Sequence, residues 1–314
     1  MRLLFVVLSV LTGTSIVQAQ VAGCRDPKAS NYVADAKVND GSCQYTNVNY
    51  IPQRIANLPS EVIETSGLFY WKDLLWTHND SGGEAALYAL DPANGQIIRK
   101  VIVAGASNVD WEDITIDKEH VYIADIGNNN GNRRDLKIYK FPIVDLEKDT
   151  VNAVAIKFAY PDQVDFSSRP NKNDYDAEAL VSIGDNLYIF SKNWESAKCR
   201  IYALPKEEGE QSARLLHEFF TNGMITGADF QAQDSLVILC GYNIALQPFV
   251  WILWDFNGTD IWSGNKRRIN LNLPFHQVEG IAWKNNSDYL LTNEEFKNIF
   301  SYTQLNNQLP ATIL

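Results

Sequence analysis

The stretch WEDITIDKEHVYIADIG, residues 111–127, contains the unit from which the fold of this chain can be predicted. It has an acidic opening, a short apolar strand, a polar turn, a second apolar strand and a polar end. Three carboxylates surround Trp111, namely that of Asp110, which directly precedes the stretch, and those of Glu112 and Asp113. Acidic residues are uncommon in strands, because like charges repel at close range and strand positions are half buried. A structural or functional reason for these three is therefore expected.

The same order recurs four more times along the chain. The other copies are TSGLFYWKDLLWTHND from Thr65, AEALVSIGDNLYIFSKN from Ala177, ITGADFQAQDSLVILCGYN from Ile225 and VEGIAWKNNSDYLLTNEE from Val278. Equivalent positions in the five openings are 46, 66, 48 and 53 residues apart, namely Ser66, Glu112, Glu178, Thr226 and Glu279. Units of about 40–50 residues with four antiparallel strands are typical of β-propeller blades.

We therefore predict an all-β fold, a five-bladed β-propeller over residues 46–314. An insert, PDQVDFSSRPNKNDYD at 161–176, explains the interval of 66 residues. Only 35 residues follow Glu279, which is enough for about three strands. The missing outer strand is expected from residues 48–58, so that the N-terminal strand closes the ring and no sheet edge stays open.

The start of the chain, residues 1–20, has the pattern of a signal peptide. A basic residue is followed by an apolar run, too short to span a bilayer, and then by small residues. We expect an exported protein that is extracellular, periplasmic or held at the cell surface. The net charge of −11 argues against nucleic acid or an anionic membrane as a partner and is compatible with divalent cations.

Residues 21–45 form a small polar module bracketed by two cysteines. In an oxidising compartment Cys24 and Cys43 are expected to form a local disulfide, whereas Cys199 and Cys240 are either a second disulfide or two buried thiols. The module resembles a GCxDPxAxNYxxxAxxxDGSC element common in exported proteins of Bacteroidetes-type bacteria. Two alternatives stay open for its oxygen-bearing side chains, Ca²⁺ binding or Asx turns in a stapled spacer; these side chains are Asp26, Asn31, Asp35, Asn39 and Asp40.

In a propeller the first strand of each blade lines the central channel, so the five equivalent positions should converge on one axis. Three of them are glutamates, and their mutual repulsion can be relieved by raised pKa values or by a bound cation. Oxygen ligands without histidine or cysteine favour Ca²⁺ over zinc or copper. The predicted metal ligands are Ser66, Glu112, Glu178, Thr226 and Glu279. The alternative is that these residues cap strands beside water in a wet channel.

The order of these five residues resembles that of the calcium-activated nucleotidases (apyrases), secreted five-bladed propellers with one axial Ca²⁺. IETSGL at 63–68 resembles that family's MELS start, and VEGIAW at 278–283 resembles its YEGIEF. The resemblance implies a calcium cage and, by extension, a calcium-dependent hydrolase. The chain departs from the family where Thr226 replaces Ser and where HNDSGG and DAEA stand in place of the loops DDRTG and HESA.

A closer resemblance is to a group of uncharacterised exported bacterial propellers. The shared features are NDSGG at 79–83, DWEDI at 110–114 and the run ADIGNNNGNRRDLKIYKF at 124–141. This resemblance implies the fold and brings no activity.

The loops that follow the second strands should meet at the same face as the five axial positions. Loops on a rigid scaffold are the usual place for binding and chemistry. Candidate catalytic groups are His78, as a general base, and Asp80, Asp125 and Glu294, which could hold a water. Candidate ligand-binding residues are Asn79, Arg133, Arg134, Lys192 and Trp194, of which the cations suit anions.

Three functions are compatible with these residues. The first is a secreted calcium-binding recognition module for a small-molecule or polymeric extracellular ligand. The second is a calcium-dependent phosphoanhydride or phosphoester hydrolase. The third, a glycan-active propeller, needs paired carboxylates about 5–9 Å apart, and carboxylates that hold a metal are not available for that role. The chain contains no GxSxG, HExxH or phosphate-binding glycine loop.

Overall fold

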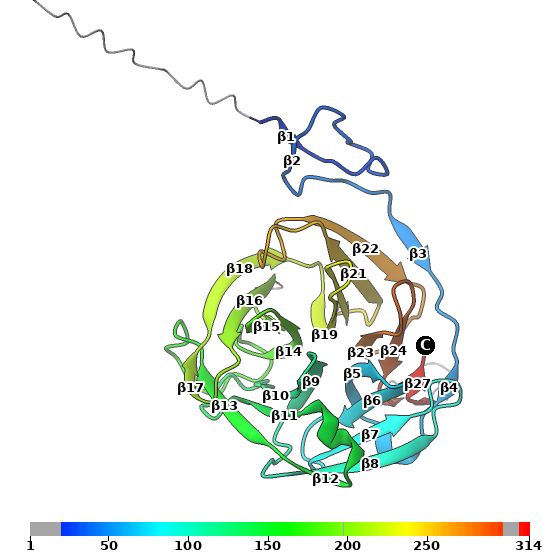
Figure 1. Cartoon of the computed structure of the whole chain (residues 1–314), viewed down its shortest axis with the longest axis vertical. Helices are drawn as coiled ribbons and strands as arrows, with labels where there is room; N and C mark the ends of the chain where they lie inside the picture. The colour runs from blue at the N-terminus through cyan, green and yellow to red at the C-terminus, as the bar shows by residue number, and fades with distance from the viewer. Residues whose placement is uncertain (1–19, 197, 298–307) are drawn as a thin grey trace, which may run out of the picture.

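The structure is a computed structural model that describes residues 20–196, 198–297 and 308–314. Within these residues five sheets of four or five strands stand around one central axis, as Figure 1 shows. The predicted all-β five-bladed propeller is confirmed. Helix is confined, in the described residues, to two short 3-10 segments, η1 (Ser60–Val62) and η2 (Ile143–Glu147). The predicted signal peptide falls outside the described residues, apart from residue 20.

The first four blades each contain four antiparallel strands, which follow one another in chain order from the axis outward. Blade 1 has β5 (Thr65–Trp71), β6 (Leu74–Asn79), β7 (Ala86–Leu90) and β8 (Ile97–Ala104). Blade 2 has β9 (Trp111–Ile116), β10 (His120–Asp125), β11 (Lys137–Pro142) and β13 (Val154–Ala159). Blade 3 has β14 (Ala177–Ile183), β15 (Asn186–Ser191), β16 (Lys198–Pro205) and β18 (Arg214–Phe220). Blade 4 has β19 (Met224–Gln231), β20 (Leu236–Tyr242), β21 (Pro248–Trp254) and β22 (Asn265–Leu271).

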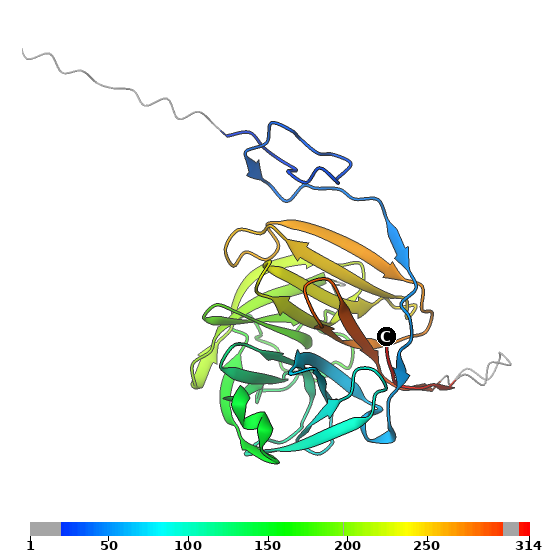
Figure 2. The ribbon, with the colours of Figure 1, turned by 45° about the vertical axis from the view of Figure 1, so that its right-hand side comes forward.

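Blade 5 is completed by both ends of the chain. Its inner strands are β23 (Val278–Trp283) and β24 (Tyr289–Asn293), followed by β27 (Thr312–Ile313) and then by β4 (Ala56–Asn57). The pair β4–β27 is antiparallel, with Thr312 opposite Asn57. This is the predicted closure by an outer strand from residues 48–58, and the two chain segments lie together in Figure 2. A separate ribbon beside this blade pairs β25 (Phe296–Lys297) with β26 (Gln308–Leu309).

Short strands outside the four-stranded sets also extend the outer edges of the sheets, two of them from the connection between the third and fourth strands of the next blade. The strand β12 (Thr150–Asn152) pairs in parallel with β8 of blade 1, and β17 (Gly209–Ser212) pairs in parallel with β13 of blade 2. The strand β3 (Val48–Tyr50) adds in the same way to β22 of blade 4. Exposed edges would pair with other chains, so these additions protect three of the five blades.

The hydrophobic core lies between blades. Five clusters of buried residues each combine side chains from two neighbouring blades, and together they run once around the ring. Between blades 1 and 2, Trp76 and Phe69 stack at 5.8 Å and share a cluster with Trp111. Burial of such side chains stabilises by about 1.5–3 kcal/mol each. The blades are therefore held face to face, and the channel keeps its shape.

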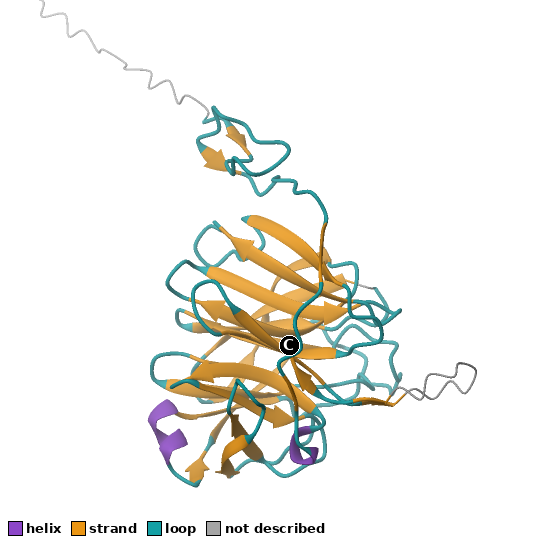
Figure 3. Ribbon diagram, turned by 90° about the vertical axis from the view of Figure 1, so that its right-hand side faces the viewer, coloured by secondary structure: helices purple, strands orange, loops and turns teal. Residues whose placement is uncertain are grey.

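The N-terminal module is stapled by the predicted disulfide between Cys24 and Cys43, and it pairs β1 (Ala22–Gly23) with β2 (Val38–Asn39). It lies outside the ring (Figure 3), and its Asn39 donates hydrogen bonds to Asp255 and Asn265 of blade 4. Asp26 accepts a hydrogen bond from the Lys28 backbone N–H at 2.9 Å, and Asp40 accepts one from that of Ser42 at 3.0 Å. These are the Asx turns expected of a spacer.

Cys199 and Cys240 are buried free thiols on blades 3 and 4 rather than a second disulfide. No helix in the described part of the chain is long and apolar enough to cross a bilayer.

Candidate functional site

A β-bulge marks the five equivalent positions in the innermost strands. In every blade the register between the first and second strands shifts by one residue at this point. The bulges leave Glu112, Glu178, Thr226 and Glu279 without a direct partner, and blade 1 places Ser66 and Gly67 opposite the single residue His78. A bulge redirects a side chain without breaking the sheet. The fivefold alignment made from the sequence is therefore a structural equivalence.

Four of the five positions line one polar cavity of about 220 Å³ at a mouth of the channel. Most of the other lining residues come from the loops after the second strands, as predicted. The full lining is Ser66, Asp80, Glu112, Asn129, Asn171, Glu178, Lys192, Trp194, Tyr242, Gln277, Glu279 and Glu294.

The two hydroxyl positions tie neighbouring blades together. Ser66 donates its hydroxyl to the carbonyl of Glu112, and Thr226 donates to the carbonyl of Val278 at 2.6 Å. Ser66 still lines the cavity, whereas Thr226 is fully buried and outside its lining. A hydroxyl oxygen keeps acceptor capacity after donating, so Ser66 can still accept a contact from a ligand in the cavity.

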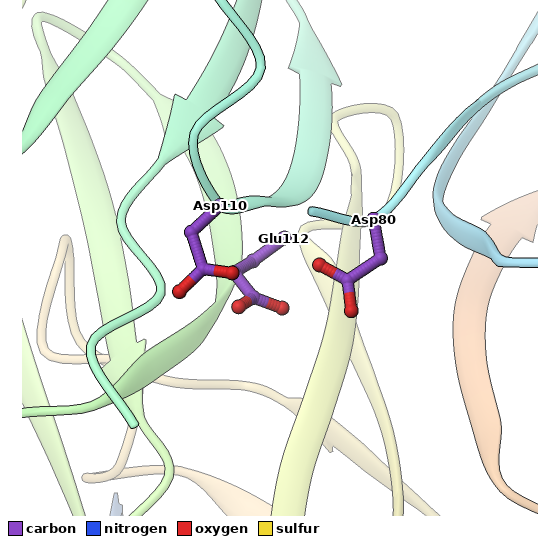
Figure 4. Close-up of side chains that lie close together, drawn as sticks. All are labelled: Asp80, Asp110 and Glu112. Carbon is purple, nitrogen blue, oxygen red and sulfur yellow. The ribbon is translucent and has the colours of Figure 1, made fainter. Parts of the chain in front are cut away.

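Carboxylates crowd into two overlapping groups in and beside the cavity. Asp80, Asp110 and Glu112 place one oxygen each within 4.8 Å of one another, and so do Glu112, Asp176 and Glu178. Figure 4 shows the first group converging. Glu112 belongs to both groups and is only 5 % exposed. Among the described residues no donor reaches its carboxylate, which lines the cavity, and Oε2 of the buried Glu178 is also without a donor.

Burial and mutual repulsion raise the pKa values of these acids. Burial raises the pKa of Asp80 to about 6 and that of Asp110 to about 7, where Asp80 adds to the effect. Burial, followed by the charges of Asp80 and Glu178, raises the pKa of Glu112 well above its usual value. A cation among the oxygens would oppose every one of these shifts. The donor set, which consists of oxygen atoms alone, fits Ca²⁺.

Lys192 supplies the cavity with a cation of its own. Its ammonium group forms a buried ion pair with Glu178 and lies 4.9 Å from the Trp194 ring centroid. Burial lowers the pKa of Lys192, but the charge of Glu178 and then those of its neighbours outweigh this, so that the pKa is raised. The lysine is therefore charged. One side of the cavity is neutralised in this way, and the side around Asp80, Asp110 and Glu112 is not.

Asp113, the residue after Glu112, closes the channel below the cavity. Its carboxylate accepts hydrogen bonds from the backbone N–H groups of Ile114, Leu180 at 2.7 Å and Ala228 at 3.2 Å. The last two belong to blades 3 and 4, so the side chain reaches across the axis. The equivalent positions in the other blades are small, namely Gly67, Ala179, Gly227 and Gly280. A Cβ atom on any of the three glycines would overlap the backbone of the adjacent blade.

The four candidate catalytic residues separate into two pairs. Asp80 and Glu294 line the cavity, and burial raises the pKa of Glu294 to about 7. His78 is fully buried outside the lining, with Nδ1 3.0 Å from the Asn79 carbonyl and its ring edge against Trp111. Burial lowers the pKa of His78 to about 4, so the ring is neutral. Asp125 forms an ion pair with Arg133 at 2.8 Å.

The five candidate ligand-binding residues are also divided. Lys192 and Trp194 line the cavity, and the Trp194 indole donates to Asp176 at 2.7 Å. Arg133 binds Asp125 and the Gly127 carbonyl inside its own loop. Arg134 lies over the Phe166 ring and lines a different pocket. Asn79 donates to the Glu61 carbonyl at 2.7 Å. Of these five residues, the structure thus brings only Lys192 and Trp194 to the cavity.

Sequence reasoning missed several residues of this site, although one signal was present. Asp110 and Asp176 stand two positions before Glu112 and Glu178, so the pattern Asp-x-Glu occurs twice. Tyr242, at the end of β20, donates its hydroxyl to Glu279 at 3.1 Å. The backbone of Gly127 lies so close to Asp110 and Glu112 that a Cβ atom would overlap both carboxylates.

No protein-family model and no curated protein sequence matches this chain. Some solved structures match this chain at low similarity. The major Malassezia sympodialis allergen Mala s 1 is 9 % identical with a TM-score of 0.43, and covers 78 % of this chain and 90 % of its own. Apo AztD from Citrobacter koseri is 9 % identical with a TM-score of 0.38, and the match covers 74 % of this chain and 68 % of the AztD chain. The RRP9 WD40 repeats are 8 % identical with a TM-score of 0.38, and the match covers 79 % of this chain and 66 % of the RRP9 chain. This chain thus spans just under two thirds of the RRP9 chain.

Proposed function

We propose that this protein is an exported calcium-binding β-propeller whose axial face binds a small-molecule or polymeric extracellular ligand. The observation that carries the proposal is the buried carboxylate of Glu112, which belongs to two carboxylate groups and has no hydrogen-bond donor among the described residues. A buried charge without a partner is costly, and a divalent cation would remove that cost. The disulfide Cys24–Cys43 supports export, because such bonds persist outside the cytoplasm.

The proposed Ca²⁺ ligands centre on Glu112. Asp80 and Asp110 would bind from one side, and Asp176 and Glu178 from the other. The set predicted from the sequence, Ser66, Glu112, Glu178, Thr226 and Glu279, shares Glu112 and Glu178 with this arrangement. Lys192 would remain paired with Glu178 and keep a second cation away from that side. Next to the metal, the aromatic rings of Trp194 and Tyr242 would offer contact surface to the ligand.

Thermal unfolding in calcium and in EDTA tests this proposal. We expect calcium to stabilise the wild-type protein, by about 2.7 kcal/mol when its concentration is a hundred times the dissociation constant. Glu112→Gln should remove this response, because it replaces the shared carboxylate. Glu119→Gln, a change at an exposed carboxylate in the turn between β9 and β10, is the matched control and should keep the response. A wild-type melting temperature that is the same in calcium and EDTA would contradict the proposal.

A calcium-dependent phosphoanhydride or phosphoester hydrolase is the second candidate. It is favoured by Asp80 and Glu294, which have pKa values of about 6 and 7 beside the charged Lys192. Such values suit proton transfer near neutral pH. Of the three cations predicted to bind an anion, Arg133 is paired with Asp125 and Arg134 lies over the Phe166 ring. Lys192 is therefore the cation that would bind a phosphate.

Phosphate release from a panel of nucleotides and phosphoesters tests this second function. Release should require calcium and should be lost in Lys192→Ala, whereas Lys198→Ala, at an exposed lysine, should leave it unchanged. No release from any member of the panel would exclude the hydrolase and leave the recognition module.

A further inference from the structure

A second cavity, of about 440 Å³, lies where the N-terminal module meets blade 4. We call it the junction cavity. Four of its lining residues belong to the module. The other four belong to blade 4, where they lie on β21 and β22 or directly after β21. They are Arg25, Asp26, Lys28 and Tyr45 from the module, and Trp254, Asp255, Asn265 and Arg267 from blade 4. None of these residues lines the axial cavity, so this inference is independent of the proposed function.

Specific polar contacts hold the two walls of the junction cavity in place. Asn39 of the module donates to Asp255 at 2.8 Å and to Asn265 at 3.0 Å. From the other side, Lys266 of blade 4 donates to the carbonyl of Gly41 at 3.0 Å. The disulfide fixes the module itself. The cavity is therefore a preformed feature of the docked module.

The acidic groups of the junction cavity are already occupied. Asp26 accepts hydrogen bonds from the Lys28 backbone at 2.9 Å and from the Tyr45 hydroxyl at 2.9 Å. Asp255 accepts the amide group of Asn39. Asp26 is thus satisfied within the module, and Asp255 accepts a hydrogen bond across the interface between the module and the blade.

The cationic groups are not occupied. Within the described residues the side chains of Arg25, Lys28 and Arg267 make no ion pair and no hydrogen bond, and Nε of Arg267 is buried without an acceptor. A buried donor without a partner is unfavourable by about 1–3 kcal/mol, more when it is charged. Only Nε of Arg267 is such a buried donor, because Arg25 and Lys28 are exposed at the rim of the cavity. The unmet requirement of this site is an acceptor with negative charge.

Aromatic rings form part of the wall beside these cations. Tyr45 and Trp254 lie with ring centroids 5.4 Å apart, and the Arg267 guanidinium is 5.5 Å from the Tyr45 ring. Two adjacent rings provide an apolar surface on which the face of a cyclic ligand can rest. An anion that also carries a ring matches both parts of the wall better than a simple inorganic ion.

We propose that the junction cavity is a binding site for a small cyclic organic anion, a sugar acid or a sugar phosphate. Its carboxylate or phosphate contacts Arg267, with Arg25 and Lys28 completing the positive charge. Its ring lies against Tyr45 and Trp254. The module then has a role beyond that of a spacer, because half of this site belongs to it.

Calorimetric titration of the full chain tests the proposal. The probes are galacturonate, glucose 6-phosphate, inorganic phosphate and neutral glucose, all in EDTA so that the axial cavity carries no divalent cation. We expect galacturonate, glucose 6-phosphate or both to bind, which also tells the sugar acid from the sugar phosphate. Glucose and inorganic phosphate should bind at least about tenfold more weakly, because each lacks one half of the recognised chemistry.

Charge-removing variants locate the binding. Arg267→Gln should lower the affinity for the sugar anion by about tenfold or more. Arg25→Gln and Lys28→Gln, at exposed positions of the module, should each weaken it in the same direction and stand in if Arg267→Gln does not fold. Lys37→Gln, on the module but outside the lining, should change nothing. The proposal is overturned if no sugar anion binds, if glucose or inorganic phosphate binds as well, or if the three lining variants bind like the wild type.

Discussion

Glu112 and Asp113 are adjacent buried carboxylates on one strand, and their surroundings are opposite. Asp113 accepts three backbone hydrogen bonds, one of them from the neighbouring blade 3 and one from blade 4 across the channel. Glu112 accepts none among the described residues and lies beside Asp80, Asp110 and Glu178. Buried polar groups are usually satisfied. The satisfied carboxylate therefore has a structural role, and the unsatisfied one indicates where a ligand belongs.

Removal of the satisfied carboxylate should have the largest effect. Asp113→Ala leaves three buried N–H groups without an acceptor, at about 1–3 kcal/mol each, and so should lower the free energy of unfolding by several kcal/mol. Urea denaturation measures this loss, which should be equal in calcium and EDTA. A loss that calcium restores would place Asp113 in the cation site and remove the contrast with Glu112.

A change of pH should alter the free energy of unfolding through the carboxylates that surround Glu112. The pKa values of Asp80 and Asp110 are raised to about 6 and 7 in the folded protein, so the folded state binds more protons than the unfolded state between pH 4 and 7. In EDTA, the contribution of these two carboxylates to stability should therefore be largest near pH 4 and be lost as the pH rises to 7, by several kcal/mol.

Calcium should reverse this trend, because it binds the ionised carboxylates. Unfolding free energies measured along a pH series in EDTA and in calcium should therefore separate as the pH rises. Parallel curves would mean that these acids do not meet a cation.

A smaller change tests the packing around the same carboxylates. The Cβ of Gly127→Ala would overlap Asp110 and Glu112, so we expect a loss of about 1–3 kcal/mol together with a weakened calcium response in thermal unfolding. Gly184→Ala is a poor control, because that glycine has a φ of +57°; Gly83→Ala, with no atom nearer than 3.9 Å, is better and should keep the response.

The smallest effects should distinguish the two hydroxyl positions. Thr226→Val and Ser66→Ala each remove one hydrogen bond between blades, which is worth about 1 kcal/mol. Only Ser66 lines the cavity, so only Ser66→Ala should also reduce calcium affinity in a titration. Equal calcium affinity in both variants would show that neither hydroxyl contacts the cation.

The repeat in the sequence was sufficient to predict the fold. Each copy of the repeat has one polar position at the start of its first apolar strand, so the number of copies gave the number of blades. The bulges explain why this position repeats, because each bulge turns a side chain toward the axis. The short C-terminal blade predicted a closing strand from residues 48–58, and β4 fills that place.

The contacts of individual side chains were harder to predict. Arg133 and Lys192 are both cations in polar loops, but one binds a carboxylate of its own loop and the other reaches the axis. This difference depends on loop conformation, which composition does not determine. Asp176 lies in an insert that breaks the repeat, and so its similarity to Asp110 was hidden.

The pairing of β4 with β27 also constrains how the molecule is made. Residues 56–57 are among the first of the ring to leave a ribosome or a translocation pore, and residues 312–313 are among the last. The early strand must wait, without a partner, while more than 250 residues follow it. A circular permutant that begins between two intact blades would remove this delay, and it should reach the native state faster while keeping the same five-bladed ring.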